Sequence, residues 1–285
     1  MPATHRHPCR SAKSKLRRRV ERSPPVGLPL AQQKNEMAFG LTSAAVAEFA
    51  ARPFIRSAIA SPCSQVSIRS FYFGVDCSSN EAPALLRDGT NIEGEMSNFW
   101  YAGHPEYDAL CRNFSDTIRM AGRNELTGEE WATVNGRMAR IILCDQLSRN
   151  SFRGTEEAFL YDGVALDLAK DLAKEALDSD YSPSEGNEIY GSYASVLTLP
   201  LMHSEYIDDH HLCLDLIDNF GMNQSPGMPW EQKKGFLLQH TAVLERFGRY
   251  PHRNGLKGRE TTPEEEKWLS SDDAPGWAKS QLPKK

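Results

Sequence analysis

Strong hydrogen-bond donors crowd the segment ERFGRYPHRN, residues 245–254, near the C-terminal end of the chain. Four of them follow one another closely: Arg249, His252, Arg253 and Asn254. Guanidinium groups bind carboxylates and phosphates through paired hydrogen bonds, and histidine transfers protons near neutral pH. Because Gly248 should end a helix and Pro251 should hold the preceding residue extended, we expect a fixed loop. The segment therefore predicts one wall of a polar site.

A second polar group continues the apolar face of a helix predicted over residues 129–150. On a helical wheel, one face carries the apolar side chains Trp131, Val134, Met138, Ile141 and Ile142. The next members of that face are Asp145 and Arg149, which can pair at i,i+4. Buried charges need partners, since an unpaired one is strongly destabilising. The same segment, DQLSRNSFRGT, adds the polar residues Gln146, Asn150 and Arg153. Its cations therefore outnumber its acids.

Histidines interrupt the apolar faces of two later helices. His240 lies on the apolar face of the helix that Gly248 should end, and His210 lies on that of the preceding helix. The segment LPLMHSE places His203 and Glu205 just ahead of that preceding helix. Four segments far apart in the sequence thus direct ionisable groups inwards. We expect these segments to meet in the folded protein.

Two interpretations of these residues are open. In the first, a pocket binds a small anionic ligand, a phosphate or a carboxylate. Its binding residues would be Asp145, Gln146, Arg149, Asn150, Arg153, His240, Arg249, Arg253 and Asn254. Its acid–base candidates are His203, Glu205 and His252. Glu205 or Asp145 would orient the histidine, and hydrolysis is the reaction that such a set could perform. In the second interpretation, an arginine–carboxylate network ties helix ends together in a non-catalytic, protein-binding scaffold.

Several other kinds of site do not fit the sequence. It contains no phosphate loop or dinucleotide fingerprint, so we predict no cofactor. The run HSEYIDDHH offers metal-binding side chains, but His203 and His210 would lie about 10 Å apart along a helix. Nearby arginines also repel a cation, so we predict no metal site.

Helical patterns follow one another from residue 98 to about residue 270, and no alternating strand pattern competes with them. The expected helices cover residues 104–121, 127–150, 155–177, 188–202, 204–220, 229–247 and 262–269. Glu130 should form a capping box with Thr127, and Glu265 should form one with Thr262. Pro200 should end or kink the helix that contains it. We predict an all-α fold, an antiparallel array of helices.

Charge divides the chain into a basic leader and an acidic body. The formal net charge is −5, but residues 1–72 carry 12 Lys and Arg against 3 Asp and Glu, which leaves 21 against 35 for the rest. An acidic body argues against nucleic-acid binding, and no apolar run approaches the roughly 18 residues of a membrane span. Six scattered cysteines without a C-x-x-C pair indicate reduced thiols. The expected partner is a small anion, or a peptide or protein.

The predicted organisation is a disordered basic leader, a linker, a helical domain and a tail, over residues 1–72, 73–97, 98–270 and 271–285. Within the leader, residues 37–70 are rich in Ala and Ser, with three arginines and one acid. That composition is typical of an organellar transit peptide. Import into a plastid or mitochondrion and a cytoplasmic location are the two alternatives. Met37 is an alternative start of the protein.

Four motifs resemble those of the domain of unknown function 924 family and occur in its order. They are FWY, DQLSRNSFRGT, LPLMHSE and RFGRYPHRN, at residues 99–101, 145–155, 199–205 and 246–254. Leu147 and Ser148 replace the Phe and Pro that are common in bacterial members, and Tyr250 replaces a Phe. The resemblance implies an all-α fold similar to tetratricopeptide-type helical repeats, with no established activity. The basic leader lies outside the family pattern and indicates a eukaryotic member.

Overall fold

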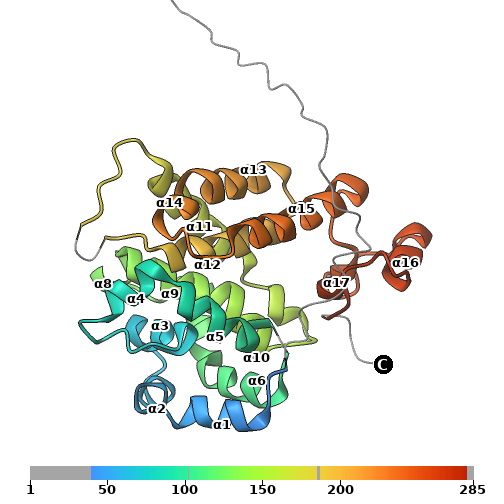
Figure 1. Ribbon diagram of the computed structural model, residues 1–285. Helices are drawn as coiled ribbons and strands as arrows, with labels where there is room; N and C mark the ends of the chain where they lie inside the picture. Colours follow the sequence, from blue (N-terminus) through green and yellow to red (C-terminus); the bar gives the residue numbers. More distant parts are fainter. Residues whose placement is uncertain (1–39, 102, 185–186, 281–285) are drawn as a thin grey trace, which may run out of the picture. The chain divides into compact units, whose positions relative to one another are not determined.

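The computed structural model describes residues 40–101, 103–184 and 187–280, which form helices and loops without a strand (Figure 1). The first helices are α1 (Ser43–Ala51), α2 (Pro53–Ala60), α3 (Gln65–Phe73), α4 (Ala82–Asp88), α5 (Thr90–Tyr101), α6 (Pro105–Cys111), α7 (Ser115–Gly122), α8 (Glu129–Ala132), α9 (Val134–Ile141) and α10 (Ser148–Ser151). The later helices are α11 (Asp162–Leu177), α12 (Gly191–His203), α13 (Ile207–Leu216), α14 (Met222–Gln224), α15 (Trp230–Phe247), α16 (Pro263–Ser270) and α17 (Gly276–Ser280). Three 3-10 helices are η2 (Arg112–Phe114), η4 (Glu156–Phe159) and η6 (Pro251–Arg253), and two π-helices are η3 (Ile142–Leu147) and η5 (Ile217–Gly221). The all-α prediction is confirmed.

Helices α1 to α5 occupy residues that the sequence patterns assigned to a disordered leader and a linker. Completely buried side chains of this region are Phe49, Ile55, Phe71 and Met96. The prediction of disorder for residues 40–72 and of a linker over 73–97 is therefore wrong. In α1, small residues face solvent while Val46 and Phe49 are buried in the core. The helix therefore has an apolar face, which is not apparent from its Ala- and Ser-rich composition. Residues 1–39, with Met37, lie outside the described residues.

Helix α12 is almost entirely buried, since every residue from Gly191 to Met202 belongs to the interior. It packs against α11, α13 and α15, and α9 packs against both α3 and α11. Pro200 does not end α12, which continues to His203. Packing on all faces stabilises this helix beyond what local propensity would allow. The buried end of α12 delivers His203 to the interior.

The helix predicted to follow Thr127 is broken into short elements. Gly128 precedes α8, and no side chain caps it, so the predicted capping box of Thr127 and Glu130 is not formed there. Thr133 instead caps α9 by accepting a hydrogen bond from the N–H of Gly136 at 3.0 Å. The π-helix η3 then adds one residue to a turn before α10 begins.

The C-terminal segment forms a small core of its own, from Val243, Leu244, Tyr250, Trp268, Ala274 and Ala278. Gly248 ends α15 in the left-handed conformation, with φ 68°, as expected. Thr262 and Glu265 form the predicted capping box at the start of α16. The predicted loose tail is wrong for residues 271–280, because α17 packs there. Of the described helices, none is both long and apolar enough to cross a membrane.

Candidate functional site

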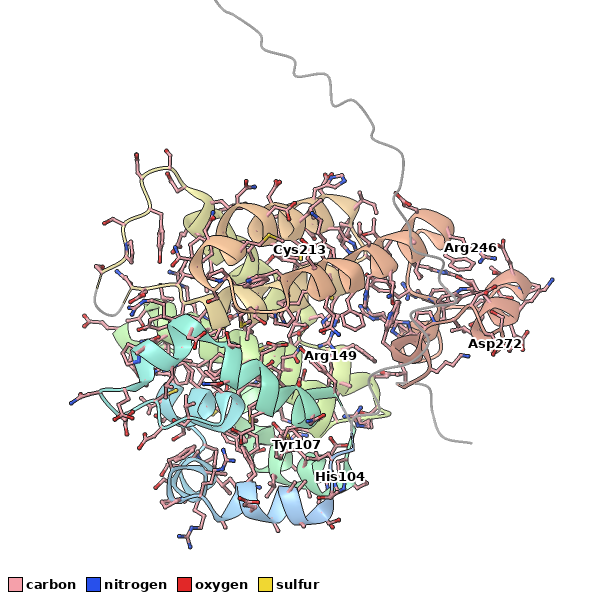
Figure 2. All side chains as sticks on the ribbon, viewed as in Figure 1. His104, Tyr107, Arg149, Cys213, Arg246 and Asp272 are labelled. Atoms are coloured by element: carbon pink, nitrogen blue, oxygen red, sulfur yellow. The ribbon has the colours of Figure 1, made fainter. Side chains whose placement is uncertain are left out.

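Asp145 lies on the π-helix η3, with only 1% of its surface exposed. Its Oδ1 atom lies 3.0 Å from Nη1 of Arg149 and 2.9 Å from Nδ1 of His203. Gln146 donates to the other carboxylate oxygen, and Arg149 also donates to the backbone carbonyl of Asp145. Figure 2 shows Arg149 in the middle of the helices rather than at their surface. The pair expected from the helical wheel is thus formed, and a histidine from α12 joins it.

The charges of Asp145 and His203 follow from burial and from their neighbours. Burial raises the pKa of Asp145, but Arg149 and the hydrogen-bonded His203 lower it by more, so the pKa of this carboxyl lies well below its usual range. Burial lowers the pKa of His203 more than Asp145 raises it, which keeps the ring neutral near pH 7. A neutral ring must donate from Nδ1 to the carboxylate. Nε2 of His203 is then a proton acceptor.

Arg253 reaches the same region from the loop after α15 and is only 3% exposed. Its Nη1 atom donates to the carbonyl oxygen of His203 at 2.9 Å and lies 3.6 Å from Oδ2 of Asp162. Asp162 is the first residue of α11, and its Oδ1 atom lies 3.0 Å from Nη1 of Arg149. One carboxylate therefore lies between two guanidinium groups.

Aromatic rings hold both arginines in place. The guanidinium carbon of Arg253 lies 5.2 Å from the ring centre of Phe159 and 4.8 Å from that of Tyr250. The guanidinium of Arg149 lies 5.4 Å from the same Phe159 ring. Cations over aromatic faces are stabilised, most of all where water is excluded. These contacts restrict the positions that both guanidinium groups can take.

Two more histidines line this region. His240 on α15 donates from Nδ1 to the carbonyl of Phe236 at 2.8 Å, and its ring stacks on Trp277 of α17 with the centres 3.9 Å apart. Burial is the main reason that the pKa of His240 falls to about 3. The ring of His252 lies 5.4 Å from that of Trp277, and burial, together with a neighbouring arginine, holds its pKa well below the usual value. Both rings are neutral near pH 7.

We call the following residues the polar centre: Asp145, Arg149, Asp162, His203, His240, His252 and Arg253. Several of its buried atoms have no hydrogen-bond partner among the described residues: Nη2 of Arg149, Nε of Arg253, Nδ1 of His252 and both carboxylate oxygens of Asp162. Buried polar atoms are almost always hydrogen-bonded, so this concentration indicates room for further hydrogen bonds to a ligand or to water. Within the same described residues, no group of three or more His, Cys, Asp or Glu could hold a metal ion.

Two predicted site residues bind a carboxylate outside the polar centre. Nε of Arg153 lies 2.7 Å from Oδ2 of Asp108, and Asn150 donates to Oδ1 of the same residue at 2.9 Å. Asp108 is buried on α6. Asn150 on α10 and Arg153 in the turn after it therefore both contact α6.

Two other predicted site residues bind Glu265, which belongs to the capping box of α16. Arg249 contacts this carboxylate at 2.7 Å, and the side-chain amide of Asn254 donates to it at 3.2 Å. The hydrogen bond from Arg249 is the main reason that the pKa of Glu265 falls to about 2. Arg249 and Asn254 thus join the loop to α16 instead of reaching the polar centre.

Glu205 anchors the same loop and does not orient a histidine. Arg259 contacts its two oxygens at 2.7 and 2.9 Å, and the backbone N–H of Tyr250 donates to one of them at 3.0 Å. Of the two carboxylates considered for orienting the histidine, Asp145 lies next to His203 and Glu205 does not. Glu205 therefore connects the start of α13 to the segment that carries Arg253.

Sequence patterns did not indicate Asp162, Arg259 or Trp277 as members of these contacts. Asp162 was expected inside a helix beginning near Thr155, whereas α11 begins at Asp162 itself. Acidic residues are common in the first turn of a helix, so the residue type of Asp162 alone did not indicate a role in these contacts. Trp277 lies in the segment predicted to be a loose tail. Only the tertiary arrangement brings these residues to their partners.

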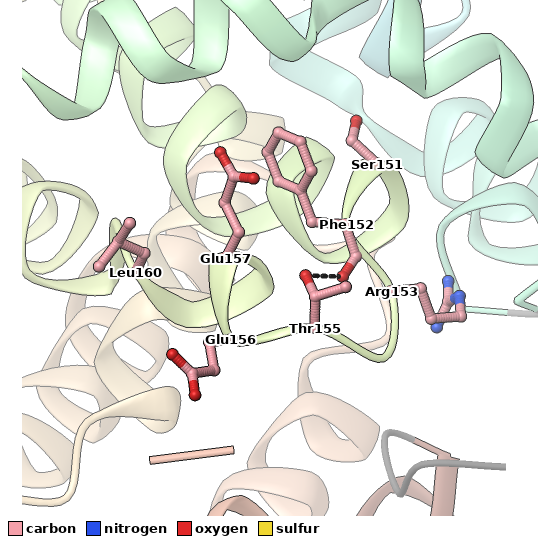
Figure 3. Close-up of a pocket in the computed structure, with 7 residues that line it drawn as sticks. All are labelled: Ser151, Phe152, Arg153, Thr155, Glu156, Glu157 and Leu160. Atoms are coloured by element: carbon pink, nitrogen blue, oxygen red, sulfur yellow. Dashed lines mark hydrogen bonds between the residues drawn. The ribbon is translucent and has the colours of Figure 1, made fainter. Parts of the chain in front are cut away.

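Two cavities among the described residues lie outside the polar centre. The larger, of about 490 Å³, is an open hollow lined by Ser151, Phe152, Arg153, Thr155, Glu156, Glu157 and Leu160 (Figure 3). The hydroxyl of Thr155 donates to the carbonyl of Phe152 at 2.7 Å within it. The smaller, of about 200 Å³, is lined by residues between Phe73 and Glu95. Of the residues predicted to line a polar pocket, Arg153 alone lines either of these two cavities.

Comparisons with known proteins agree with the motifs. Residues 68–273 match the family model described as a bacterial protein of unknown function (DUF924). A solved structure of a protein of unknown function from Agrobacterium tumefaciens is similar over 64% of this chain and 99% of that one, with 28% identity and a TM-score of 0.47. No curated protein matches the chain. Because the family model covers most of the chain, including every residue of the polar centre, this protein belongs to the DUF924 family.

Proposed function

We propose that the polar centre binds a small anionic ligand and that His203 acts there as a general base, with hydrolysis as the reaction. The observation that carries this proposal is the hydrogen bond between Asp145 and His203 beside two buried guanidinium groups. A carboxylate that fixes the tautomer of a histidine is a recurring arrangement in acid–base catalysis. Arg149 and Arg253 would bind the anionic group of the ligand.

In the proposed hydrolysis, Nε2 of His203 takes a proton from a water molecule whose oxygen attacks an acyl or phosphoryl centre of the ligand. The imidazolium, stabilised by Asp145, then returns the proton to the leaving group as its bond to that centre breaks. The neutral state of His203 at pH 7 is required for this role, since a protonated ring cannot accept a proton. The guanidinium groups would stabilise negative charge that develops on the substrate. Because Arg149 and Arg253 are only 8% and 3% exposed, ligand entry would require side chains to move. Trp277 stacks on His240, and its movement would uncover that ring.

A thermal-shift screen of the full chain against phosphorylated and carboxylated metabolites tests the binding step. Ligands that bind only the folded state raise the melting temperature. The variant Arg253→Gln should lose this shift, because it removes a guanidinium of the polar centre. Arg249→Gln is the matched control, since it removes a guanidinium of the same loop that binds Glu265 instead. If no compound shifts the wild-type protein, or if both variants lose the shift equally, the anion site is refuted.

The catalytic step needs a separate variant. With a ligand in hand, His203→Gln should keep binding measured by calorimetry but should lose turnover, since the amide can donate to Asp145 and cannot act as the base. Unchanged turnover in His203→Gln would remove the general base from the proposal and would leave a binding protein.

A second candidate function is a non-catalytic scaffold that binds a peptide or protein. The hollow of Figure 3 favours it, because this hollow is open and Leu160 on its edge is 68% exposed. In this case the polar centre would be a structural network. The double variant Arg149→Ala with Arg253→Ala would then lower stability while a partner, once identified, still binds. Loss of a small-molecule response without loss of stability would speak for the first candidate.

A further inference from the structure

Asp162 holds an unusual position, because its carboxylate lies between two buried arginines and bonds well to neither. Oδ1 lies 3.0 Å from Nη1 of Arg149, and Oδ2 lies 3.6 Å from Nη1 of Arg253. Both oxygens are buried, yet neither forms a hydrogen bond of good geometry with a described residue. Charged hydrogen bonds are normally short and aligned. Asp162 is therefore attracted electrostatically to both arginines without forming the aligned hydrogen bonds that usually accompany such an ion pair.

The arginines have spare donors at the same place. Nη2 of Arg149 and Nε of Arg253 are buried without a partner among the described residues. Asp162 is attached to the first turn of α11, which limits where its short side chain can reach. Phe159 contacts both guanidinium groups, so these cannot easily turn towards Asp162. A free carboxylate, unlike the tethered one, can align with both arginines.

The charges of the polar centre also limit the ligand. Its three histidines are neutral near pH 7, so two arginines balance Asp145 and Asp162. A monoanion adds one negative charge to this neutral, buried centre, whereas a phosphate dianion adds two. Adding uncompensated charge to a buried site is costly, and the cost rises with the charge. A small carboxylate therefore fits better than a phosphate.

We infer that Asp162 is an internal substitute for the ligand, that it neutralises Arg149 and Arg253 in the free protein, and that a small monocarboxylate displaces it on binding. This inference rests on the proposed function and identifies the substrate class of the same site. It also makes Asp162 a residue that determines affinity, because each ligand must compete with it. Weakening Asp162 should strengthen binding, which is the opposite of what loss of a binding residue does.

The test compares the binding of acetate and of inorganic phosphate by the full chain, using calorimetry and thermal shift at pH 7. Asp162→Asn removes the competing charge and should lower the dissociation constant for acetate by tenfold or more. Asp108→Asn is the matched control, since it removes a buried carboxylate that pairs with Arg153 outside the polar centre. It should leave acetate binding unchanged. Asp162→Glu keeps the charge, reaches further towards Arg253 and should weaken acetate binding severalfold.

The outcomes separate this inference from the proposed function. If acetate or phosphate binds and Asp162→Asn does not tighten acetate binding, or if phosphate binds more tightly than acetate, the inference is wrong and the anion site stands. If neither anion binds the wild-type protein or any variant, the proposed function fails as well. Should Asp162→Asn not fold, Asp162→Glu decides the matter: acetate binding as tight as in the wild-type protein overturns the role of Asp162.

Discussion

The polar centre combines permanently charged groups with histidines that are kept neutral. Burial lowers the pKa values of His203, His240 and His252, because a charged ring would lose its hydration. Two guanidinium groups nearby add to this effect by repelling a further positive charge. In the proposed function, the arginines would bind the anion while His203 would exchange the proton, so the two tasks would fall on different side chains.

The tautomer of His203 is the first prediction. In the wild-type protein at pH 7, nitrogen chemical shifts of labelled histidine should show His203 as neutral and protonated at Nδ1, because Asp145 can only accept a hydrogen bond there. In Asp145→Asn the amide can donate as well as accept, so the preference for this tautomer should disappear. A wild-type ring protonated at Nε2 would contradict the geometry and, with it, the proposed role as a base.

Inward-facing Asp145 and Arg149 were predictable from the helical wheel, although the reason differs from the one expected. The wheel assumed a continuous α-helix, whereas η3 changes the register in this segment. Both residues are buried nevertheless, because every residue from Ile141 to Ser151 is buried whichever way it points. The pairing of Arg149 with Asp162 could not be predicted, since it depends on where α11 packs.

At the scale of elements, the junction of α8 and α9 depends on a glycine. A Cβ atom at Gly136 would lie 2.2 Å from the carbonyl oxygen of Glu130 and 2.4 Å from the Cα atom of Trp131. Such contacts with backbone cannot be relieved by turning a side chain. Gly136 therefore lets α9 begin directly against α8.

The variants Gly136→Ala and Gly235→Ala should change stability in opposite directions. Both glycines lie within helices, where alanine is intrinsically better by about 1 kcal/mol. Gly235 on α15 has nothing within 4 Å of its would-be Cβ, so its variant should be more stable by roughly 0.5–1 kcal/mol. Gly136→Ala should be less stable by about 1–3 kcal/mol, because overpacking outweighs propensity. Urea unfolding measures both, and equal effects would show that α8 and α9 are not in contact as described.

The later helices were more predictable than the first ones. The end of α15 at Gly248 and the capping box of α16 follow from residue types at fixed spacing, which is a local signal. The composition of helices α1 to α5 is also typical of a targeting segment. Local sequence patterns cannot distinguish such a segment from helices of the folded body. The place of α1 to α5 in the folded body depends on the packing of α3 against α9 and on the main core that their side chains share, which the sequence alone does not display.

At the scale of the whole molecule, the described residues between 40 and 280 form one compact unit whose main core includes side chains from α1, α3 and α5. A chain that begins at residue 98, the boundary expected from the sequence, would lack these side chains. Loss of a single large core side chain costs about 2–5 kcal/mol, which is a large part of typical stability. That chain should show no cooperative unfolding by circular dichroism, whereas a chain beginning at residue 40 should unfold cooperatively. A folded 98–285 protein would contradict the core as described.

Acid should destabilise the protein before its carboxylates titrate. The unfolded chain binds protons on histidine near pH 6.5, whereas in the folded state the pKa of His240 is about 3 and those of His203 and His252 are also lowered. Between pH 6.5 and the lower folded-state pKa values, the unfolded state binds more protons than the folded state. The free energy of unfolding is therefore highest above pH 6.5 and falls as the pH drops below it. Each such histidine contributes about 1.4 kcal/mol per pH unit.

Urea unfolding between pH 7.5 and pH 5 measures this slope. His240→Gln should make it shallower by about one proton, because glutamine can replace the hydrogen bond to Phe236 but does not titrate. His211→Gln is the control, since that histidine is on the surface. Stability that stays constant down to pH 5 would mean that the three histidines are not held neutral by burial.

The π-helix η3 makes the length of one segment as important as its residue types. A π-turn holds one residue more than an α-turn, so deleting one residue from 142–147 would let this segment close into α-turns and would move its remaining side chains to new directions around the helix axis. Asp145 and Arg149 could not both keep their present directions. A lineage that loses one residue here must therefore lose or rebuild the polar centre at the same step. In an alignment of the family, members with a gap within 142–147 should therefore differ in function from members without one.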